Sequence, residues 1–526
     1  MHDIRFSTDA DTLEPYLRDE SSFTGHADGL AVLDDARDVE AIASLLRDAS
    51  ASGRAVTFSA RRTSLTGAAV PEGGLVVAIP ALAGPEHVTV DTSRGRATAP
   101  ASVFMADVAD AAERAGLFFP PDPTSRKTCS LGGAVACNAS GARSFRYGPT
   151  GAFVEGLTVV LATGDILRLE RGAHPPVDGH FVLSLARGPV RIPVPEARPT
   201  GIKNALGYAT FDPPDVIDLF IGSEGTLGYI AEATLRLLPG VEVFAALALF
   251  PSEATALDFV AALQSETPPH GVRPMSVEWF DRRALALAAA RYPRLGVPDE
   301  AVSGLLLEEA HPPGDGEAVM EHWYTALIEA GVPDAPAWLR VPTSHAQHEA
   351  LRDFRHAVPE SVNALARQRG LRKLGTDLAW PRPMLHRMAA LYHEVLADLP
   401  AAVGPEVCAD FLARHGRPFP KTLDTATFGH VGDSHLHVNL LPADPVEMAA
   451  GKIVYDHLSR LCAAAGGAIS GEHGIGKAKR PMLAETTPTG RLATMRAIKH
   501  ALDPAGILCR GNILDAGTKV DDRSGR

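Results

Sequence analysis

The sequence predicts an α+β protein built from more than one domain. A β-α-β pattern opens the chain, and from residue 243 onward strands and helices alternate. At 526 residues the chain is too long for a single hydrophobic core. Hydrophobic residues make up 45% and charged residues 21% of it, which is typical of a folded globular protein.

The first 240 residues begin with a strand at 30–33, followed by a helix that we expect Asp35 to cap. Val39, Ile42 and Leu46 recur at helical spacing in that helix. Pro and Gly are frequent in residues 171–200, so we expect a long surface excursion there and not a domain boundary. The other expected elements are strands at 55–59, 75–79, 157–162, 166–169 and 229–238, a helix at 102–115, and glycine-rich segments at 120–148 and 218–228.

In the second half the alternation predicts a mixed sheet with helices on one face. The polar residues 517–526 are expected to fray. The expected strands are 243–250, 275–280, 303–309, 371–379, 425–430 and 435–441, and the expected helices are 252–265, 281–291, 315–330, 382–398 and 445–464.

The charge and cysteine content exclude several classes of function. A formal charge of -13 argues against general binding to nucleic acid or to anionic lipid, because both need clustered cations. The five cysteines form no Cys-x-x-Cys pair, which disfavours a structural zinc site, a disulfide scaffold and an iron–sulfur site, and fits a reducing cytoplasm. No run approaches the ~20 apolar residues of a spanning helix, so no transmembrane segment is expected.

Glycine-rich loops at 120–141 and 220–228 suggest a site for a bulky anion. Their small side chains let backbone N–H groups approach a diphosphate closely. Tight turns beside close-packed helices are the alternative for any single Gly-Gly pair. No loop fits G-x-G-x-x-G after a strand, so a Rossmann nicotinamide site is not indicated. The segment 471–477 has P-loop spacing, but Ala478 replaces the magnesium-binding hydroxyl residue.

The run from His430 to Asn439 carries the densest chemistry in the chain. Alternate residues of a strand share one face, so His435 and His437 should point the same way, and a turn at 432–433 could return His430 to them. Together with Glu472, two imidazoles would form an open site for a divalent cation. A lone histidine on such a face is more often structural. His435 and His473 are both candidates for proton transfer, and the sequence alone does not rank them.

Seven ordered motifs resemble one family, the FAD-linked oxidases of the vanillyl-alcohol oxidase type, in the branch of D-lactate, glycolate and D-2-hydroxyglutarate dehydrogenases. The resemblance implies a two-subdomain FAD-binding domain of the vanillyl-alcohol oxidase/p-cresol methylhydroxylase type with an α+β ferredoxin-like cap domain. It divides the chain into an FAD-binding domain at 1–240, a cap or substrate domain with metal-binding histidines at 241–468, and a C-terminal segment at 469–526 that returns to the FAD domain. The motifs lie at 123–125, 132–133, 138–141, 146–148, 222–228, 430–439 and 470–476.

The same resemblance implies the roles of individual residues. FAD, bound non-covalently, would contact Thr63, Ser64, Gly67, Pro123, Ser125, Gly132, Gly133, Asn138, Gly141, Glu224, Gly225 and Ile230. A divalent metal, zinc or manganese, would be held by His430, His437 and Glu472. His473 would be the catalytic base, with His435 as a second candidate, and Arg355 would bind the substrate carboxylate.

The implied reaction is hydride transfer from a small D-2-hydroxy acid to flavin, which yields the 2-keto acid. Because no iron–sulfur domain follows, the resemblance implies a separate electron acceptor: a quinone, a cytochrome, an electron-transfer flavoprotein or an iron–sulfur protein. It is compatible with a homodimer, and with a cytoplasmic location either free or peripheral to the inner face of the membrane. Arg61 and Arg62 depart from the small residues of relatives, and Pro359 replaces a hydroxyl residue of the hydroxyglutarate enzymes.

Three other functions remain open at the level of sequence. The first is an alkyl-transferring flavoenzyme of the ether-lipid type. The second is the FAD-binding subunit of a multi-subunit glycolate oxidase. The third is a flavin-free metallohydrolase that uses His430, His437 and Glu472, which would leave the glycine-rich loops without a role.

Overall fold

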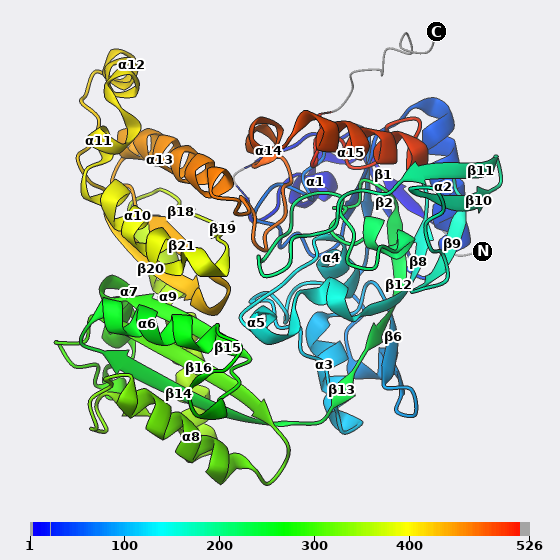
Figure 1. Cartoon of the computed structure of the whole chain (residues 1–526). Coiled ribbons are helices and arrows are strands. Elements are labelled where there is room, and N and C mark those ends of the chain that lie inside the picture. The colour runs from blue at the N-terminus through cyan, green and yellow to red at the C-terminus, as the bar shows by residue number, and fades with distance from the viewer. Residues whose placement is uncertain (1–3, 22, 516–526) are drawn as a thin grey trace.

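The computed structural model describes residues 4–21 and 23–515. Three larger sheets organise this part of the chain, two in the first 240 residues and one between residues 242 and 440. Figure 1 shows the first two sheets on one side of the molecule and the third on the other. The expected fraying of residues 517–526 concerns residues outside the described chain, and the division at 240 and 468 remains a proposal.

The first sheet has four strands in the order β1-β2-β4-β3. Strands β2, β4 and β3 run parallel, and helix α2 connects β2 to β3, so the expected β-α-β opening is confirmed. The expected cap is wrong: the side chain of Asp38, not of Asp35, accepts the N–H of Ala41 at the start of α2. The elements are β1 (Arg5–Ser7), β2 (Gly29–Val32), α2 (Val39–Ser52), β3 (Val56–Ser59) and β4 (Leu75–Ala78).

The second sheet has the order β5-β6-β12-β8-β9 and is antiparallel. Its β5–β6 hairpin was not expected from the sequence. Helix α4 was also not expected, because it forms inside the glycine-rich segment, where Ser130 caps it and Gly132 packs against Ala101. The elements are β5 (Thr89–Asp91), β6 (Arg96–Pro100), α3 (Met105–Arg114), α4 (Leu131–Ala136), β8 (Val154–Val160), β9 (Ile166–Glu170) and β12 (Tyr229–Arg236).

The excursion at 171–200 contains a hairpin of β10 (His180–Leu185) and β11 (Gly188–Pro193). Strand β11 lies against α15 (Thr489–Leu502), which follows α14 (Arg480–Thr486) near the end of the described chain. Residues 507–509 then run along β3, since Val56 exchanges backbone hydrogen bonds with Ile507 and Cys509. The C-terminal segment is therefore packed onto the first two sheets, as Figure 1 shows.

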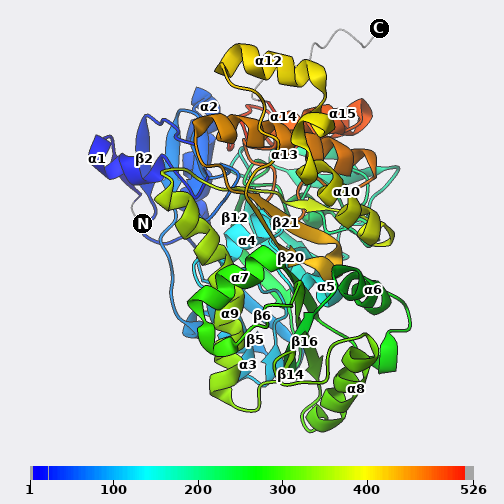
Figure 2. The same cartoon turned by 90° about the vertical axis from the view of Figure 1, so that its left-hand side faces the viewer.

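The third sheet differs from the expectation in two ways. All pairings between its strands are antiparallel, so it is not mixed. Helices also cover both faces, not one, as Figure 2 shows for α7 and α9 on one side and α6 and α8 on the other. The strand order is β17-β14-β16-β15-β20-β21-β18, with β19 also paired to β21.

The reason lies in strand β14 (Glu242–Phe250), which is apolar on both faces. Ala246, Ala248 and Phe250 pack with α6 (Glu253–Leu263) and α8 (Gly316–Glu329). The intervening residues Leu247 and Leu249 pack with α7 (Arg282–Arg291) and α9 (His345–Gln368). A continuous apolar run must be buried on both sides, so a single helical layer could not cover this strand.

Helix α9 is the longest element that the sequence analysis missed. It carries Pro359 in its interior and is polar on average, which hides its apolar positions. Those positions, Leu351, Phe354, Val358 and Val362, nevertheless recur every three or four residues and are all buried. Arg355 therefore lies on a helix that packs against the third sheet.

The expected strand at 371–379 is interrupted. Strands β18 (Leu374–Gly375) and β19 (Leu378–Ala379) both pair with β21, and Thr376 and Asp377 lie between them. The Thr376 hydroxyl accepts the N–H of Val438 and donates to the carbonyl of Leu436, and the Thr376 N–H donates to the carbonyl of Val438.

The remaining elements complete the second half of the chain. They are β15 (Ser276–Asp281), β16 (Ser303–His311), β17 (Leu339–Arg340), α10 (Leu385–Ala397), α11 (Leu399–Val403), α12 (Pro405–His415), β20 (Thr425–His430), β21 (His435–Leu440) and α13 (Pro445–Ala464). Among the described residues, no helix is both long enough and apolar enough to cross a membrane.

Packing of α9 gives a first prediction. The Phe354 ring is fully buried and lies edge-on to Phe280, with 5.3 Å between ring centroids. We expect Phe354→Ala to lower the free energy of unfolding by about 3–5 kcal/mol, because it leaves a cavity between helix and sheet. Chemical denaturation measures this, with Leu412→Ala at an exposed position of α12 as the control. A change below about 0.5 kcal/mol, as expected for the control, would contradict the packing of α9.

Candidate active site

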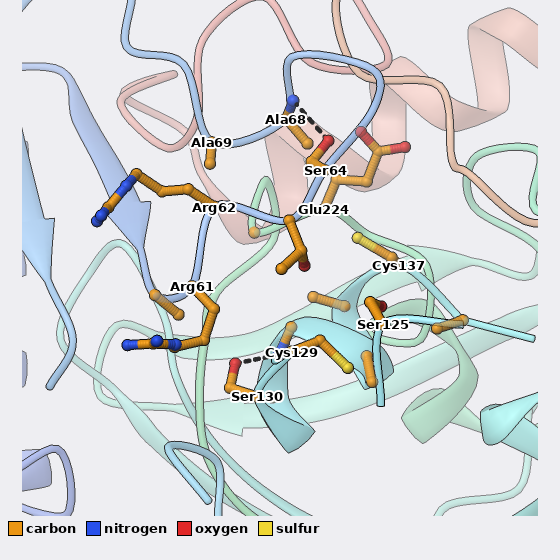
Figure 3. Close-up of a pocket in the computed structure, with 18 of the residues that line it drawn as sticks. Arg61, Arg62, Ser64, Ala68, Ala69, Ser125, Cys129, Ser130, Cys137 and Glu224 are labelled. Carbon is orange, nitrogen blue, oxygen red and sulfur yellow. Dashed lines mark hydrogen bonds between the residues drawn. The ribbon is translucent and has the colours of Figure 1, made fainter. Parts of the chain in front are cut away.

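A cavity of about 670 Å³ lies among the glycine-rich loops. This volume is in the range of sites for large cofactors. We call residues 61–69, 120–141 and 220–228 the first, second and third loops. Figure 3 shows Ser64 and Ala68 of the first loop across the cavity from Ser125 and Cys129 of the second. The third loop and the C-terminal segment complete the wall with Glu224, Gly225, Tyr229, Ile230, Glu472, His473 and Cys509.

Nine of the twelve expected cofactor residues line this cavity. They are Thr63, Ser64, Pro123, Ser125, Gly132, Gly133, Glu224, Gly225 and Ile230. The other three shape the loops around it. Gly67 has a φ of +81°, Asn138 accepts the N–H of Gly151 at 3.0 Å, and a Cβ on Gly141 would lie 2.0 Å from the carbonyl oxygen of Asp122.

The cavity has groups that suit a dinucleotide. Ser140 Oγ in the cavity wall is buried and has no hydrogen-bond partner among the described residues, so a bound ligand could satisfy it. The guanidinium groups of Arg61 and Arg62, missed as ligand contacts, lie at the same cavity and stack on Phe104 and Tyr16. Their positive charge suits a diphosphate, and they replace the small residues expected there.

Three cysteines line the cavity, Cys129, Cys137 and Cys509. Burial raises the pKa of all three thiols, most strongly that of Cys137. A neutral thiol is a poor nucleophile, so these side chains offer no reactive thiolate for a covalent link to a cofactor. Their chemistry agrees with the expected non-covalent binding.

The carboxylate of Glu224 ties the third loop to the C-terminal segment. Its two oxygen atoms accept the N–H groups of Ile475 at 2.6 Å and Gly476 at 2.7 Å. Burial raises the pKa of Glu224 to about 7, although both hydrogen bonds oppose this rise.

The histidine cluster forms as expected on a tight hairpin. His430 at the end of β20 pairs with His435 at the start of β21, and the ring centroids of His430 and His437 are 5.5 Å apart. Glu472 faces both: its Oε2 lies 3.2 Å from His430 Nε2, and its Oε1 lies 3.3 Å from His437 Nε2. The structure thus brings the three expected metal ligands together.

The far nitrogen of each imidazole has a partner of its own. His430 Nδ1 is hydrogen-bonded to the carboxylate of Glu278 on β15, and His437 Nδ1 lies 2.9 Å from the carbonyl oxygen of Thr376. Both partners accept hydrogen bonds, so Nδ1 carries a hydrogen in each ring, and Nε2 is the ring atom that faces Glu472. This arrangement, two oriented imidazoles and one carboxylate, suits a divalent cation such as zinc or manganese.

A buried lysine that the sequence analysis missed completes this cluster. Lys203 Nζ lies 2.8 Å from Glu472 Oε2 and donates to the carbonyl of Gly141 at 3.1 Å. Burial alone would raise the pKa of Glu472, but Lys203 and His430 hold it well below its usual value. Glu472 is therefore ionised, as a metal ligand must be.

The structure separates the two candidates for proton transfer. His435 is fully buried and does not line the cavity, with its Nε2 2.9 Å from Asp377 Oδ1, and burial lowers its pKa to about 3. His473 lines the cavity, and its ring stacks on His437 with 5.7 Å between centroids. Burial lowers the pKa of His473 to about 4, which keeps it neutral. His473 alone of the two is placed to meet a ligand in the cavity.

Arg355 reaches the cluster from helix α9. Its Nε lies 3.2 Å from Glu278 Oε2, so one carboxylate contacts both Arg355 and His430. The sequence offers a signal for Glu278 in retrospect, since it is a lone acid between Val277 and Trp279 in a buried strand. Lys203 lies in a Gly- and Pro-rich loop without a comparable signal.

The chain matches known families over most of its length. Residues 241–513 match the family described as FAD linked oxidases, C-terminal domain, and residues 31–170 match the FAD binding domain. A D-2-hydroxyglutarate dehydrogenase of Xanthomonas citri is 30% identical, over 98% of this chain and 96% of that protein. Glycolate oxidase subunit GlcD of Bacillus subtilis is 30% identical, over 87% and 84%. A D-lactate dehydrogenase of Archaeoglobus fulgidus is 29% identical, over 90% and 89%.

A solved structure of alkyldihydroxyacetonephosphate synthase is similar in fold, with a TM-score of 0.61 and 14% identity, over 96% of this chain and 81% of that one. Together with the match to the FAD binding domain, this likeness confirms the expected α+β fold of the vanillyl-alcohol oxidase/p-cresol methylhydroxylase type.

The raised pKa of Glu224 predicts a pH dependence of stability. Between pH 4.5 and about 7 the folded protein binds a proton at Glu224 that the unfolded chain has released, so this residue's contribution to stability falls as the pH rises. Relative to Glu224→Gln, the wild type should lose up to about 3 kcal/mol across this window. Denaturation at saturating FAD from pH 5 to pH 8 measures the difference, with Glu232→Gln on an exposed part of β12 as the control. A difference that stays constant with pH would contradict the assignment.

Proposed function

Because the chain belongs to the FAD-linked oxidases, and is thus an FAD-dependent oxidoreductase, we propose that it oxidises a small D-2-hydroxy acid to the 2-keto acid. The observation that supports this most is that Glu472 belongs both to the wall of the cavity and to the histidine cluster, and that His473, also in the wall, stacks on His437 of that cluster. A substrate bound at the cluster would lie beside the cofactor. The substrates named for the relatives, D-lactate, glycolate and D-2-hydroxyglutarate, share the 2-hydroxy acid group that such a site would hold.

Each proposed role has a structural basis. When bound, FAD would supply the hydride acceptor, and a divalent metal held by His430, His437 and Glu472 would supply positive charge beside the substrate. His473 is the proposed base: it is neutral, and its Nε2 points to the side of Glu472, at 3.6 Å from Oε1. It would take the proton of the substrate hydroxyl.

Arg355 is proposed to bind the substrate carboxylate. Its Nε is held by Glu278, which fixes the plane of the guanidinium, and Nη1 lies 4.0 Å from Asp122 Oδ2. The paired contact with the substrate carboxylate would use the terminal nitrogens. His435 is better suited to supporting its neighbours than to proton transfer, because it is buried behind His437.

The electron acceptor that reoxidises the flavin is also a proposal. We propose a separate acceptor, which would be a quinone, a cytochrome, an electron-transfer flavoprotein or an iron–sulfur protein. We also propose that the protein is a homodimer. Its proposed location is the cytoplasm, either free or peripheral to the inner face of the membrane. The FAD-binding subunit of a multi-subunit glycolate oxidase is the alternative that the GlcD relatives favour.

An anaerobic substrate screen tests the reaction. We expect D-lactate, glycolate or D-2-hydroxyglutarate to bleach the flavin absorbance of the purified protein, and the L-isomers of the chiral acids to leave it unchanged. Absence of bleaching with every acid, in protein that holds FAD and metal, would contradict the proposal and favour the subunit alternative. Turnover without any external acceptor would instead favour alkyl transfer.

The same screen separates the metal from the flavin. After chelation and removal of metal, measured by elemental analysis, the FAD should remain bound while reduction by the hydroxy acid slows by at least about 10²-fold. Restoring zinc or manganese should restore the rate. An unchanged rate in metal-free protein would remove the metal from the proposal and leave the flavin reaction standing.

The role of Arg355 predicts a specific kinetic change. Arg355→Lys keeps a positive charge beside Glu278 but loses the planar fork, so kcat/KM should fall by about 10- to 100-fold, mostly through KM. Arg352→Lys, one turn earlier on α9 and paired with Glu349 at the surface, is the matched control and should change little. Equal effects of the two substitutions would contradict carboxylate binding by Arg355.

A further inference from the structure

The two residues between β18 and β19 contact most of the histidine cluster. The carbonyl oxygen of Thr376 accepts a hydrogen bond from His437 Nδ1. Asp377 is a fully buried carboxylate, and the groups that donate hydrogen bonds to it come from two different parts of the chain. Those donors are His435 Nε2 at 2.9 Å, Ser470 Oγ at 2.8 Å, Lys479 Nζ at 2.5 Å, the backbone N–H of Glu472 at 3.1 Å and the backbone N–H of His473 at 3.0 Å.

The two backbone contacts fix the loop that carries the proposed base. Asp377 Oδ1 accepts the N–H of Glu472, and Oδ2 accepts the N–H of His473. The His473 ring also turns back to the same carboxylate, with Nδ1 3.4 Å from Oδ2. One side chain therefore sets both the position of this loop and the direction of its imidazole.

The charge of Asp377 decides which ring nitrogen carries the proton. An ammonium group at 2.5 Å, that of Lys479, favours the ionised carboxylate, which can only accept hydrogen bonds. Nδ1 of His473 lies 3.4 Å from Oδ2 of Asp377, closer than Nε2 lies to Oε1 of Glu472 at 3.6 Å, so the hydrogen is favoured at Nδ1. Nε2 of His473 then carries no hydrogen and has a free lone pair. This nitrogen lies on the edge of the ring that faces Glu472 and the cavity.

We propose that Asp377 is a positioning residue for the oxidation, which holds His473 in the Nδ1–H tautomer so that Nε2 can accept the hydroxyl proton of the substrate. This inference rests on the proposed function for its kinetic consequence, but the tautomer itself does not depend on any substrate. Asp377 is fully buried and does not line the cavity, so it would act through His473.

The first test reads the tautomer directly. Histidine labelled with ¹⁵N in the FAD-loaded protein should give an Nδ1–H signal for His473, assigned as the signal lost in His473→Ala. In Asp377→Asn, whose amide can donate as well as accept, this signal should move to the other tautomer or to a mixture. An Nε2–H tautomer for His473 in the wild type would overturn the proposal, and this measurement needs no variant at Asp377 to fold.

The second test asks whether Asp377 acts through His473. The rate of anaerobic flavin reduction is measured with the hydroxy acid that bleaches the wild type fastest. Asp377→Asn should slow it by about 10²-fold or more, within the range for general base catalysis. In the background of His473→Ala the same substitution should change the rate by less than about threefold, since there is no imidazole left to orient. Independent, multiplicative losses in the double variant would overturn the proposal.

Two further variants separate positioning from folding. Asp377→Glu retains a carboxylate, and it should keep the Nδ1–H signal and more of the rate than Asp377→Asn. Asp218→Asn is the matched control, because Asp218 is equally buried and has similar partners. Its carboxylate accepts hydrogen bonds from the backbone N–H groups of Phe211 and Asp215 and from the guanidinium of Arg171. It should lower thermal stability while the reduction rate of the FAD-loaded protein stays within about twofold. A loss of rate equal to that of Asp377→Asn would overturn the proposal.

If no hydroxy acid reduces the flavin, the proposed function fails while the tautomer measurement still stands. If reduction is normal and His473 has the other tautomer, only the inference about Asp377 fails.

Discussion

A buried carboxylate must be matched by positive or hydrogen-donating groups, and the contacts of Glu472 join three separate parts of the chain. Lys203 comes from the first half, His430 and His437 come from the hairpin of the third sheet, and Glu472 itself lies on the C-terminal segment. Leaving such a carboxylate without partners would cost several kcal/mol. The electrostatic requirement of this one residue therefore favours the arrangement in which the third sheet closes against the cavity among the glycine-rich loops.

The connection continues outward from Glu472 through shared carboxylates. Glu278 joins His430 to Arg355, and Asp122 lies 4.0 Å from Arg355 and 3.2 Å from Arg126. Asp122 belongs to the glycine-rich segment of the FAD-binding half, whereas Glu278 and Arg355 belong to the third sheet and its helix. The contacts of the proposed substrate site are thus also contacts between the two halves, and a displacement of one half would alter the other's side chains.

The sequence predicted the local features of this arrangement better than the distant ones. The turn after His430 and the alternation of β21 are local, and both formed as expected. Helix α9 was missed because Pro359 and many polar residues obscure its apolar spacing, and the second helical layer was missed because an apolar run such as β14 does not reveal how many of its faces are covered. The expected FAD and metal residues came from ordered motifs of a family, not from periodicity.

The missed site residues have a common physical cause. Lys203 and Glu472 are 269 residues apart, and Glu278 and His430 are 152 apart. No sequence pattern reports a pair at such a separation. What a sequence can show is an isolated charge among apolar neighbours, as at Glu278, and such a residue must find a partner somewhere in the fold.

The charge balance of the cluster would favour an anionic ligand. The ion pairs around Arg355 and Glu472 join four cations, Arg126, Arg143, Arg355 and Lys203, to four carboxylates, Asp122, Glu278, Glu308 and Glu472. Burial alone would lower the pKa of His430, but Glu278 raises it to about 9, so a protonated His430 would bring the total to one positive charge. A divalent cation in place of that proton would bring it to two. The proposed reaction brings the substrate carboxylate there, and it builds negative charge on the hydroxyl oxygen while His473 gains the positive charge of the proton. A net positive cluster is therefore a physical reason to expect a metal as well as an arginine at this site.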